Sequence, residues 1–359
     1  MRIAVSAVLA AVCFGAAACA DPPPDFMLKL TFDGRQIEGK PLTWDSHLVR
    51  LLGRDGRLWE FPPDKATDFS KSADRFRSYS PSEFRAELLR ELGKEFEVTG
   101  TGHYLVAHPR GQRDKWAQRF EDLYRSFVHY FSVRGFRPVS PPFPLIGVVC
   151  KDRSDFHRYT ASLGRPVPPG VLGFYELDSN RIILYDIDGG RDSQNWQETA
   201  SVIIHEAAHQ TAFNTGVHGR YAPPPLWVVE GLATTFEAPG VYDSRHHTQQ
   251  ADRINRDRFE YFKQRVAPKH KTELLLRMIA SDGLFRSNPS TAYAEAWALS
   301  FYLVETQPRK YAKYLAMTAK QPPFGDCTAS QRTADFTSVF GDDWPMLEAR
   351  LLRFMEGLK

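Results

Sequence analysis

The sequence predicts an α+β protein, in which a small β-rich module precedes a larger mixed domain with a helical C-terminal part. Residues 26–75 alternate apolar and polar side chains between turn signals, which is typical of strands. A continuous apolar run, Leu145–Cys150, precedes a hairpin pattern and predicts a second sheet. The last third of the chain has helical patterns. We therefore expect a module at 26–75 and a main domain at 80–359.

The first twenty residues resemble a signal peptide. Arg2 supplies a positive start, and Ile3–Ala18 is an apolar run that is short for a membrane span. Cleavage before Asp21 would give a secreted or periplasmic protein. The alternative is a degenerate lipoprotein box that ends at Cys19, whose acylation would anchor the chain to the cell envelope. No other segment approaches transmembrane length, so we expect no span in the mature chain.

Composition gives no indication of a nucleic-acid partner, and it does not decide whether the cysteines form a disulfide. The 46 basic and 43 acidic residues give a net charge of +3, and no basic stripe indicates nucleic-acid binding. Beyond the targeting segment the cysteines are Cys150 and Cys327. In an oxidising compartment they could form a disulfide, and the alternative is two free thiols.

The N-terminal module has the pattern of short strands joined by tight turns. Met27–Phe32 alternates and is followed by the turn signal Asp33–Gly34, and His47–Leu52 is followed by Asp55–Gly56. A strongly bent sheet or a small barrel fits this pattern. The sequence does not distinguish a binding module from one that only packs.

The central part of the chain mixes helices and strands. An aromatic stripe that includes Phe120, Phe127 and Phe131 recurs at helical spacing and is typical of core. Leu145–Cys150 predicts a central strand, and Gly173–Asp186 predicts a hairpin that turns at 178–180. The other elements that we expect here are helices at 81–93, 113–133 and 155–162, and strands at 96–98 and 103–107.

The C-terminal third is predicted to be helical. The segments with helical spacing are 251–266, 271–281, 291–305, 308–319 and 343–357.

One stretch carries the chemistry, Ser201-Val-Ile-Ile-His205-Glu206-Ala-Ala-His209-Gln210. Histidines four residues apart lie on one face of a helix, so both imidazoles can bind one metal ion. Asn195-x-x-Glu198 predicts the start of this helix, and Gly216 can end it. Glu206 lies between the histidines and can direct its carboxylate at a water near the metal.

A second motif supplies a third ligand. Glu230 follows His209 by 21 residues, within Trp227-Val-Val-Glu230-Gly231-Leu-Ala233. The run Pro223–Pro225 ends any earlier helix and allows a new one to begin near Leu226. Two histidines and a glutamate leave a fourth position open, which is typical of a catalytic zinc site that holds one ion. His218 could serve as another ligand, but a surface-loop role is favoured.

These two motifs together resemble those of the gluzincin metallopeptidases. The resemblance covers about 96–305. Within this group, the chain is most similar to a branch of secreted, peptidase-like bacterial proteins. Trp-x-x-Glu230-Gly-x-Ala is also similar to the second motif of the zinc aminopeptidases. The competing metzincin pattern requires Gly and His where this chain has Ala212 and Thr215. The resemblance implies a mixed sheet whose edge strand lies over the metal-binding helix.

The resemblance also implies further site residues. An extended substrate would pair with the edge strand before the metal helix, which we place at Arg181–Tyr185 with Arg181, Ile183 and Tyr185 as substrate-binding residues. The alternative is a strand without a ligand. Tyr293 matches a tyrosine that stabilises the oxyanion in zinc aminopeptidases, with helix-start packing as the alternative. Glu176 loosely matches their amine-binding Gly-x-Met-Glu-Asn strand, but Met and Asn are missing.

The sequence therefore predicts a secreted zinc metallopeptidase that acts on a peptide or protein substrate. His205, His209 and Glu230 would hold the zinc ion, and Glu206 would be the general base. Thr234 and Glu237 are candidates to orient a ligand from the same helix as Glu230. One alternative is a non-catalytic envelope or extracellular protein that uses the fold for binding or scaffolding. Another is hydrolysis of a non-peptide amide.

Overall fold

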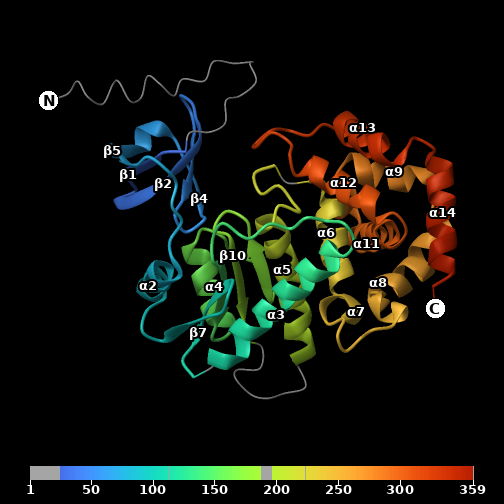
Figure 1. Ribbon diagram of the computed structural model, residues 1–359, viewed down its shortest axis with the longest axis horizontal. Helices are drawn as coiled ribbons and strands as arrows, with labels where there is room; N and C mark the ends of the chain where they lie inside the picture. The colour runs from blue at the N-terminus through green and yellow to red at the C-terminus, as the bar shows by residue number, and fades with distance from the viewer. Residues whose placement is uncertain (1–24, 112, 187–195, 223, 359) are drawn as a thin grey trace.

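The structure is a computed structural model that describes residues 25–111, 113–186, 196–222 and 224–358. The expected targeting segment, with Cys19, and the expected helix start at Asn195 lie outside these residues. The described chain is an α+β protein with an N-terminal β module, a second sheet and a helical C-terminal part (Figure 1). This confirms the predicted fold class. No helix among the described residues is long and apolar enough to span a membrane.

The N-terminal module is one antiparallel sheet of five strands in the order β4-β3-β2-β1-β5. Asp33 and Gly34 both have positive φ, so they form the tight turn that their sequence predicts. β5 pairs with β1, and no pairing joins β5 to β4 among the described strands, so the sheet is open and is not a closed barrel. Its elements are β1 (Met27–Phe32), β2 (Arg35–Trp44), β3 (Val49–Gly53), β4 (Leu58–Phe61), η2 (Pro63–Lys65) and β5 (Ala66–Ala73).

The second sheet has the strand order β6-β7-β8-β10-β9. The three inner strands β7, β8 and β10 are parallel, and β6 and β9 are antiparallel edge strands. The bounds are β6 (Phe96–Gly100), β7 (Tyr104–Pro109), β8 (Leu145–Cys150), β9 (Gly173–Glu176) and β10 (Arg181–Tyr185). The prediction that 181–185 is the edge strand is therefore wrong, because β10 pairs on both sides. β9 occupies that edge.

Helices cover both faces of this sheet. α3 (Arg113–Ser132) and α5 (Trp196–Asn214) pack on one face together with Ile182 and Leu184 of β10. α2 (Pro81–Leu92) and α4 (Arg153–Ser162) pack on the other face with Ile183. The aromatic stripe of α3 is buried in the core, as predicted. α5 ends at Asn214, and Gly216 has a φ of +75°, which suits a residue that ends a helix.

The C-terminal part is helical, with two departures from the prediction. The segment 251–266 is divided between a 3-10 turn, a short α-helix and a π-helical turn, and 329–340 forms a helix that the sequence did not predict. The elements are α6 (Leu226–Phe236), α7 (Pro239–Tyr242), η3 (Gln250–Arg253), α8 (Arg256–Tyr261), η4 (Phe262–Val266), η5 (Ala267–Lys269), α9 (Thr272–Ala280), α10 (Gly283–Ser287), α11 (Pro289–Thr306), α12 (Pro308–Thr318), α13 (Ala329–Phe340) and α14 (Trp344–Glu356).

α6 and α11 approach each other closely at Gly231. A Cβ atom built on Gly231 would lie 2.2 Å from Ser300 Oγ and 2.4 Å from the carbonyl oxygen of Ala296. Any side chain at this position would collide with the backbone of α11. The glycine after Glu230 therefore allows α11 to pack against the helix that carries this candidate ligand.

The N-terminal module contacts the main domain near the β9–β10 turn. The Leu58 amide of β4 donates a hydrogen bond of 2.7 Å to the carbonyl oxygen of Asp178. The Arg50 guanidinium lies 4.2 Å from the centroid of the Phe324 ring. The module is thus attached to the hairpin that contains the edge strand β9.

Among the described residues, the cysteines Cys150 and Cys327 are free thiols in separate parts of the molecule. Cys150 is buried on β8 in the cluster that includes Phe156 and Ile183. Cys327 lies before α13, where its thiol interacts with Arg332. The structure therefore does not contain the disulfide considered from the sequence.

Candidate metal centre

Three side chains from two helices converge on one point. His205 and His209 project from α5 one turn apart, and their Nε2 atoms are 2.9 Å apart. Glu230 projects from α6, with its Oε2 atom 3.3 Å from His205 Nε2 and 3.7 Å from His209 Nε2. Among the described residues this is the one cluster of three or more such groups that could hold a metal ion.

The donor set fits zinc. Ligand atoms around a tetrahedral Zn²⁺ ion lie about 3.3 Å apart for bond lengths of about 2.0–2.1 Å, and the three separations bracket this value. Glu230 Oε2 is buried and lacks a hydrogen-bond donor within the described part of the chain. Burial would raise the pKa of Glu230, but the imidazoles of His209 and His205 outweigh it and lower the pKa. The carboxylate is therefore ionised, as a metal ligand must be.

Glu206 lies beside the cluster in a fixed position. Its Oε2 atom accepts a hydrogen bond of 2.6 Å from the Tyr175 amide of β9. Burial raises the pKa of Glu206, and His205 and His209 reduce this effect only in part. A buried carboxylate with a raised pKa is suited to accept and return a proton. The contact with Tyr175 was not predicted, because a main-chain donor leaves no pattern in the side chains.

Glu237 orients one of the histidines. His205 Nδ1 is 2.7 Å from Glu237 Oε1, and the Asn255 amide donates to Glu237 Oε2 at 2.7 Å. A carboxylate on the outer nitrogen fixes the ring and leaves Nε2 to face the cluster. Thr234, the other candidate for this role, instead donates to the carbonyl oxygens of Glu230 and Gly231 in its own helix. The structure brings Glu237 to the site and keeps the Thr234 hydroxyl in the helix.

Tyr293 reaches the cluster from α11. The Tyr293 side chain lies close to the Glu230 carboxylate, and burial together with this carboxylate raises the pKa of Tyr293. The ring packs edge-on against Phe285, with centroids 5.4 Å apart, and Arg258 lies over it. The hydroxyl thus stays protonated at neutral pH and remains a donor beside the candidate metal ligands.

The predicted substrate-binding residues of β10 face away from this site. Arg181 is buried and forms an ion pair with Glu91 at 2.7 Å, and it also donates to the Tyr159 hydroxyl. Ile183 and Tyr185 pack in the same apolar cluster under α4. The side chains point there because alternate residues of a strand face opposite sides of the sheet. Placing these three residues at the substrate site was therefore wrong.

Glu176 and His218 also lie in surroundings that differ from those expected from the sequence. Glu176 is not free to hold an amine, because its carboxylate accepts from the amides of Ser179 and Asp178 and pairs with Arg165. His218 is buried and packs against Phe213, so it is not a surface residue. It is not a member of the metal cluster.

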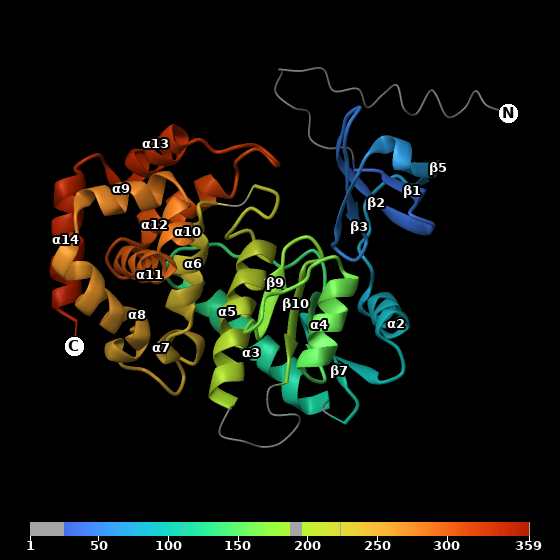
Figure 2. The ribbon, with the colours of Figure 1, turned by 180° about the vertical axis from the view of Figure 1, so that it is seen from behind.

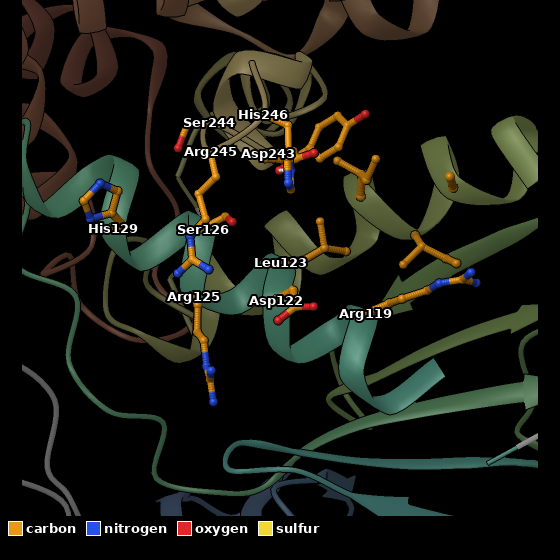
Figure 3. A pocket seen from close by; sticks show the side chains of 14 residues that line it. Arg119, Asp122, Leu123, Arg125, Ser126, His129, Asp243, Ser244, Arg245 and His246 are labelled. Atoms are coloured by element: carbon orange, nitrogen blue, oxygen red, sulfur yellow. Dashed lines mark hydrogen bonds and ion pairs between the residues drawn. The ribbon is translucent and has the colours of Figure 1, made fainter. Parts of the chain in front are cut away.

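A separate cavity of about 540 Å³ lies between α3, the start of α5 and the loop after α7 (Figure 3). Figure 3 shows Leu123 and Asp122 of α3 on one side and Asp243 and His246 on the other. Ile204 lines this cavity, whereas the next residue, His205, faces α6. None of the candidate metal ligands lines the cavity, so it is not part of the metal centre.

Comparisons with known proteins give distant similarities. Residues 199–325, about a third of the chain, match a family described as a protein of unknown function, DUF1570. This stretch includes both candidate metal-binding motifs and Tyr293. No curated protein matches the chain.

Three similar solved structures are variants of M1 zinc metallopeptidases. One, from Deinococcus radiodurans, has 14% sequence identity and a TM-score of 0.40 over 73% of this chain and 50% of that one. A structure of such a variant from the same organism, with a Tyr-Ser-Ala substrate, has 13% identity and a TM-score of 0.38 over 74% and 52% of the two chains. Another holds L-arginine, with the same identity, score and coverage. The chain spans about half the length of these structures.

Proposed function

We propose that this chain is a zinc-dependent metallopeptidase that hydrolyses peptide bonds with Glu206 as the general base. The observation that supports this most directly is the arrangement of His205, His209 and Glu230 around one point, with the Glu206 carboxylate held beside it. A structural zinc site would have four protein ligands, whereas this cluster has three. An open position next to a buried carboxylate is what a hydrolytic site requires.

The side chains have distinct roles in the proposed reaction. His205 and His209 would hold the ion through Nε2, and Glu230 would hold it through Oε2. Zinc, when bound, supplies a Lewis acid that lowers the pKa of a water and polarises a carbonyl group. The Glu206 carboxylate accepts a proton from the attacking water and returns it to the leaving amine. Burial raises the pKa of Glu206, which helps the carboxylate to hold the proton between the two transfers.

Tyr293 would stabilise the transition state. Its protonated hydroxyl lies next to Glu230 and can donate to the negative oxygen that develops on the attacked carbonyl group. The edge-on contact with Phe285 helps to orient the Tyr293 ring.

The substrate would bind along β9. This strand lies beside α5 and has no strand partner on its outer side within the described chain (Figure 2). An extended peptide can pair with the main chain of such an edge and lie across Glu206. The proposal thus moves substrate recognition from the side chains of β10 to the backbone of Gly173–Glu176.

The cellular location remains part of the proposal. The signal-like segment 1–20 supports secretion or a periplasmic location, with lipid anchoring through Cys19 as the alternative. Mass analysis of the mature N-terminus distinguishes them, because an acylated Cys19 has a different mass from a chain that begins at Asp21.

The first experiment compares metal content and turnover. Plasma mass spectrometry of purified protein should find about one zinc per chain, and Glu230→Ala should hold much less. Glu206→Gln should keep the zinc and lose at least about a hundredfold in kcat, because the general base is missing. Peptide libraries and cell-wall amides provide the substrates and separate peptidase from amidase action.

The outcomes separate the proposal from its alternatives. Retained activity in Glu206→Gln would exclude the proposed mechanism. Zinc binding without hydrolysis of any amide would favour a binding or scaffold protein. A folded parent that takes up no zinc, even with excess metal, would exclude a metallopeptidase.

A further inference from the structure

Arg258 is a cation beside the candidate site without a carboxylate partner. It lies on α8, half-buried, with Cζ 5.1 Å from the centroid of the Tyr293 ring. Within the described residues its guanidinium forms no hydrogen bond or ion pair. Other half-buried arginines that contact the helical part are paired: Arg253 and Arg134 with Glu305, and Arg332 with Asp282.

The position of Arg258 is coupled to that of the metal ligands. Its backbone amide donates to the Asn255 side chain at 3.2 Å, and Asn255 donates in turn to Glu237. Glu237 orients His205. The same short hydrogen-bond network therefore positions both the arginine and a candidate metal ligand. A group that recognises substrate has to be held in a fixed position relative to the reacting groups.

The nearby carboxylates already have partners. Glu230 faces the two imidazoles, Glu206 holds the Tyr175 amide, and Glu237 lies between His205 and Asn255. None of them is paired with Arg258. A half-buried guanidinium presents five donors in a planar fork, which matches a carboxylate group.

We propose that Arg258 binds a carboxylate of the substrate, so that the site prefers peptides with a negative group close to the scissile bond. This inference rests on the proposed peptidase function. The guanidinium lies over the ring of Tyr293, whose hydroxyl faces the candidate site. The distance from the guanidinium to this hydroxyl is shorter than about three residues of extended chain, at about 3.3 Å per residue. The carboxylate is either an acidic side chain or the C-terminus of a short peptide.

Matched peptides test this preference in the zinc-loaded protein. Glu and Gln are nearly isosteric, so we compare kcat/KM for Glu and Gln at each of three positions on either side of a cleaved bond. A second set compares a free C-terminal carboxylate with its amide. Hydrogen bonds to a charged group contribute about 1.5–3 kcal/mol, so we expect one carboxylate peptide to exceed its neutral twin by at least about tenfold.

Two variants identify the residue responsible. Arg258→Met should reduce the ratio between charged and neutral twins to near one. Lys263→Met is the matched control, because Lys263 is an exposed cation over an aromatic ring, that of Phe259, in the next turn. This control should retain the ratio. Both twins depend equally on Tyr293 and Glu206, so a general loss of activity cancels in the ratio.

Binding to Glu206→Gln separates this inference from the proposed function. Calorimetry with the same peptide pairs measures the preference without turnover. One outcome is a charge preference in binding that Arg258→Met removes, while the zinc-loaded parent protein cleaves no peptide. This outcome would support the role of Arg258 and exclude the peptidase. Cleavage of charged and neutral twins at equal rates, or a ratio that Arg258→Met leaves unchanged, would overturn the role of Arg258.

Discussion

At the scale of single residues, the contact between Glu237 and His205 bears on the proposed metal site. Glu237 Oε1 lies 2.7 Å from His205 Nδ1 and fixes the ring with Nε2 toward the cluster. Partners of this kind typically contribute 10–100-fold to metal affinity. We predict that Glu237→Ala weakens zinc binding by about that factor, measured by competition with a chromogenic chelator.

Thr234 provides the control for this measurement. It lies one turn before Glu237, and its hydroxyl bonds only to carbonyl oxygens of α6. Thr234→Val should leave zinc affinity within about twofold. Equal losses in both variants would mean that disturbance of α6, and not the ring contact, reduces the affinity.

Residues whose roles depend on spacing in the sequence could be predicted, and residues whose roles depend on tertiary contacts could not. His205 and His209 are four apart on one helix, so their pairing follows from local structure, and Glu230 was predicted from its motif on the next helix. Arg258 lies far along the chain from both motifs and has no local pattern. Arg181 was wrongly predicted to bind substrate, because the sequence of one strand does not show whether that strand lies at the edge or in the middle of the sheet.

At the scale of elements, the packing of α6 on α11 depends on Gly231. An added methyl group would collide with Ser300 and with the backbone of Ala296. Overpacking of this kind costs about 1–3 kcal/mol. We predict that Gly231→Ala lowers the free energy of unfolding by that amount, measured with urea. Gly283→Ala is the control, because its Cβ would meet only an ordinary contact at 3.4 Å, and it should change stability by less than about 1 kcal/mol.

Most elements were predicted because their apolar residues recur at one period. The helix α13 was missed although Phe336 and Val339 form a buried stripe, because a polar run precedes it. The predicted helix 251–266 begins with a 3-10 turn and ends in a π-helical turn that leads to Pro268. Such local changes of hydrogen bonding follow from packing and not from periodicity.

At the scale of the whole molecule, a buried triad joins three parts of the helical region. His270 lies between Glu295 of α11, at 2.9 Å, and Glu348 of α14, at 2.8 Å. Burial would lower the pKa of His270, but these two carboxylates raise it to about 9. A pKa that is higher in the folded than in the unfolded chain means that the charged imidazole stabilises the fold.

The triad predicts a loss of stability at alkaline pH. Its contribution is fully present below the unfolded pKa of about 6.5 and is lost as pH rises through about 9, and the shift corresponds to roughly 3 kcal/mol. Unfolding of the metal-free protein between pH 6 and 10 should show this decline, and His270→Gln should show a flatter curve. A ring titration by NMR near pH 6.5 would contradict the prediction.

Zinc should also stabilise the whole molecule, because its ligands come from two different layers. His205 and His209 belong to a helix that packs on the sheet, whereas Glu230 belongs to a helix that packs on α11. A ligand at a thousand times its Kd adds about 4 kcal/mol. We predict a higher Tm with zinc in the parent and little change in Glu230→Ala, measured by calorimetry with and without chelator.

The hydrogen bond from the Tyr175 amide to Glu206 affects how a substrate-trapping variant of this protein should be made. Glutamine at position 206 keeps a carbonyl oxygen that can accept from this amide, so the edge of β9 stays engaged as in the parent. Alanine removes the acceptor and leaves an unpaired donor on an open strand, where a peptide backbone can take its place. The alanine variant should therefore retain peptides longer than the glutamine variant, and affinities measured with it would overstate those of the parent.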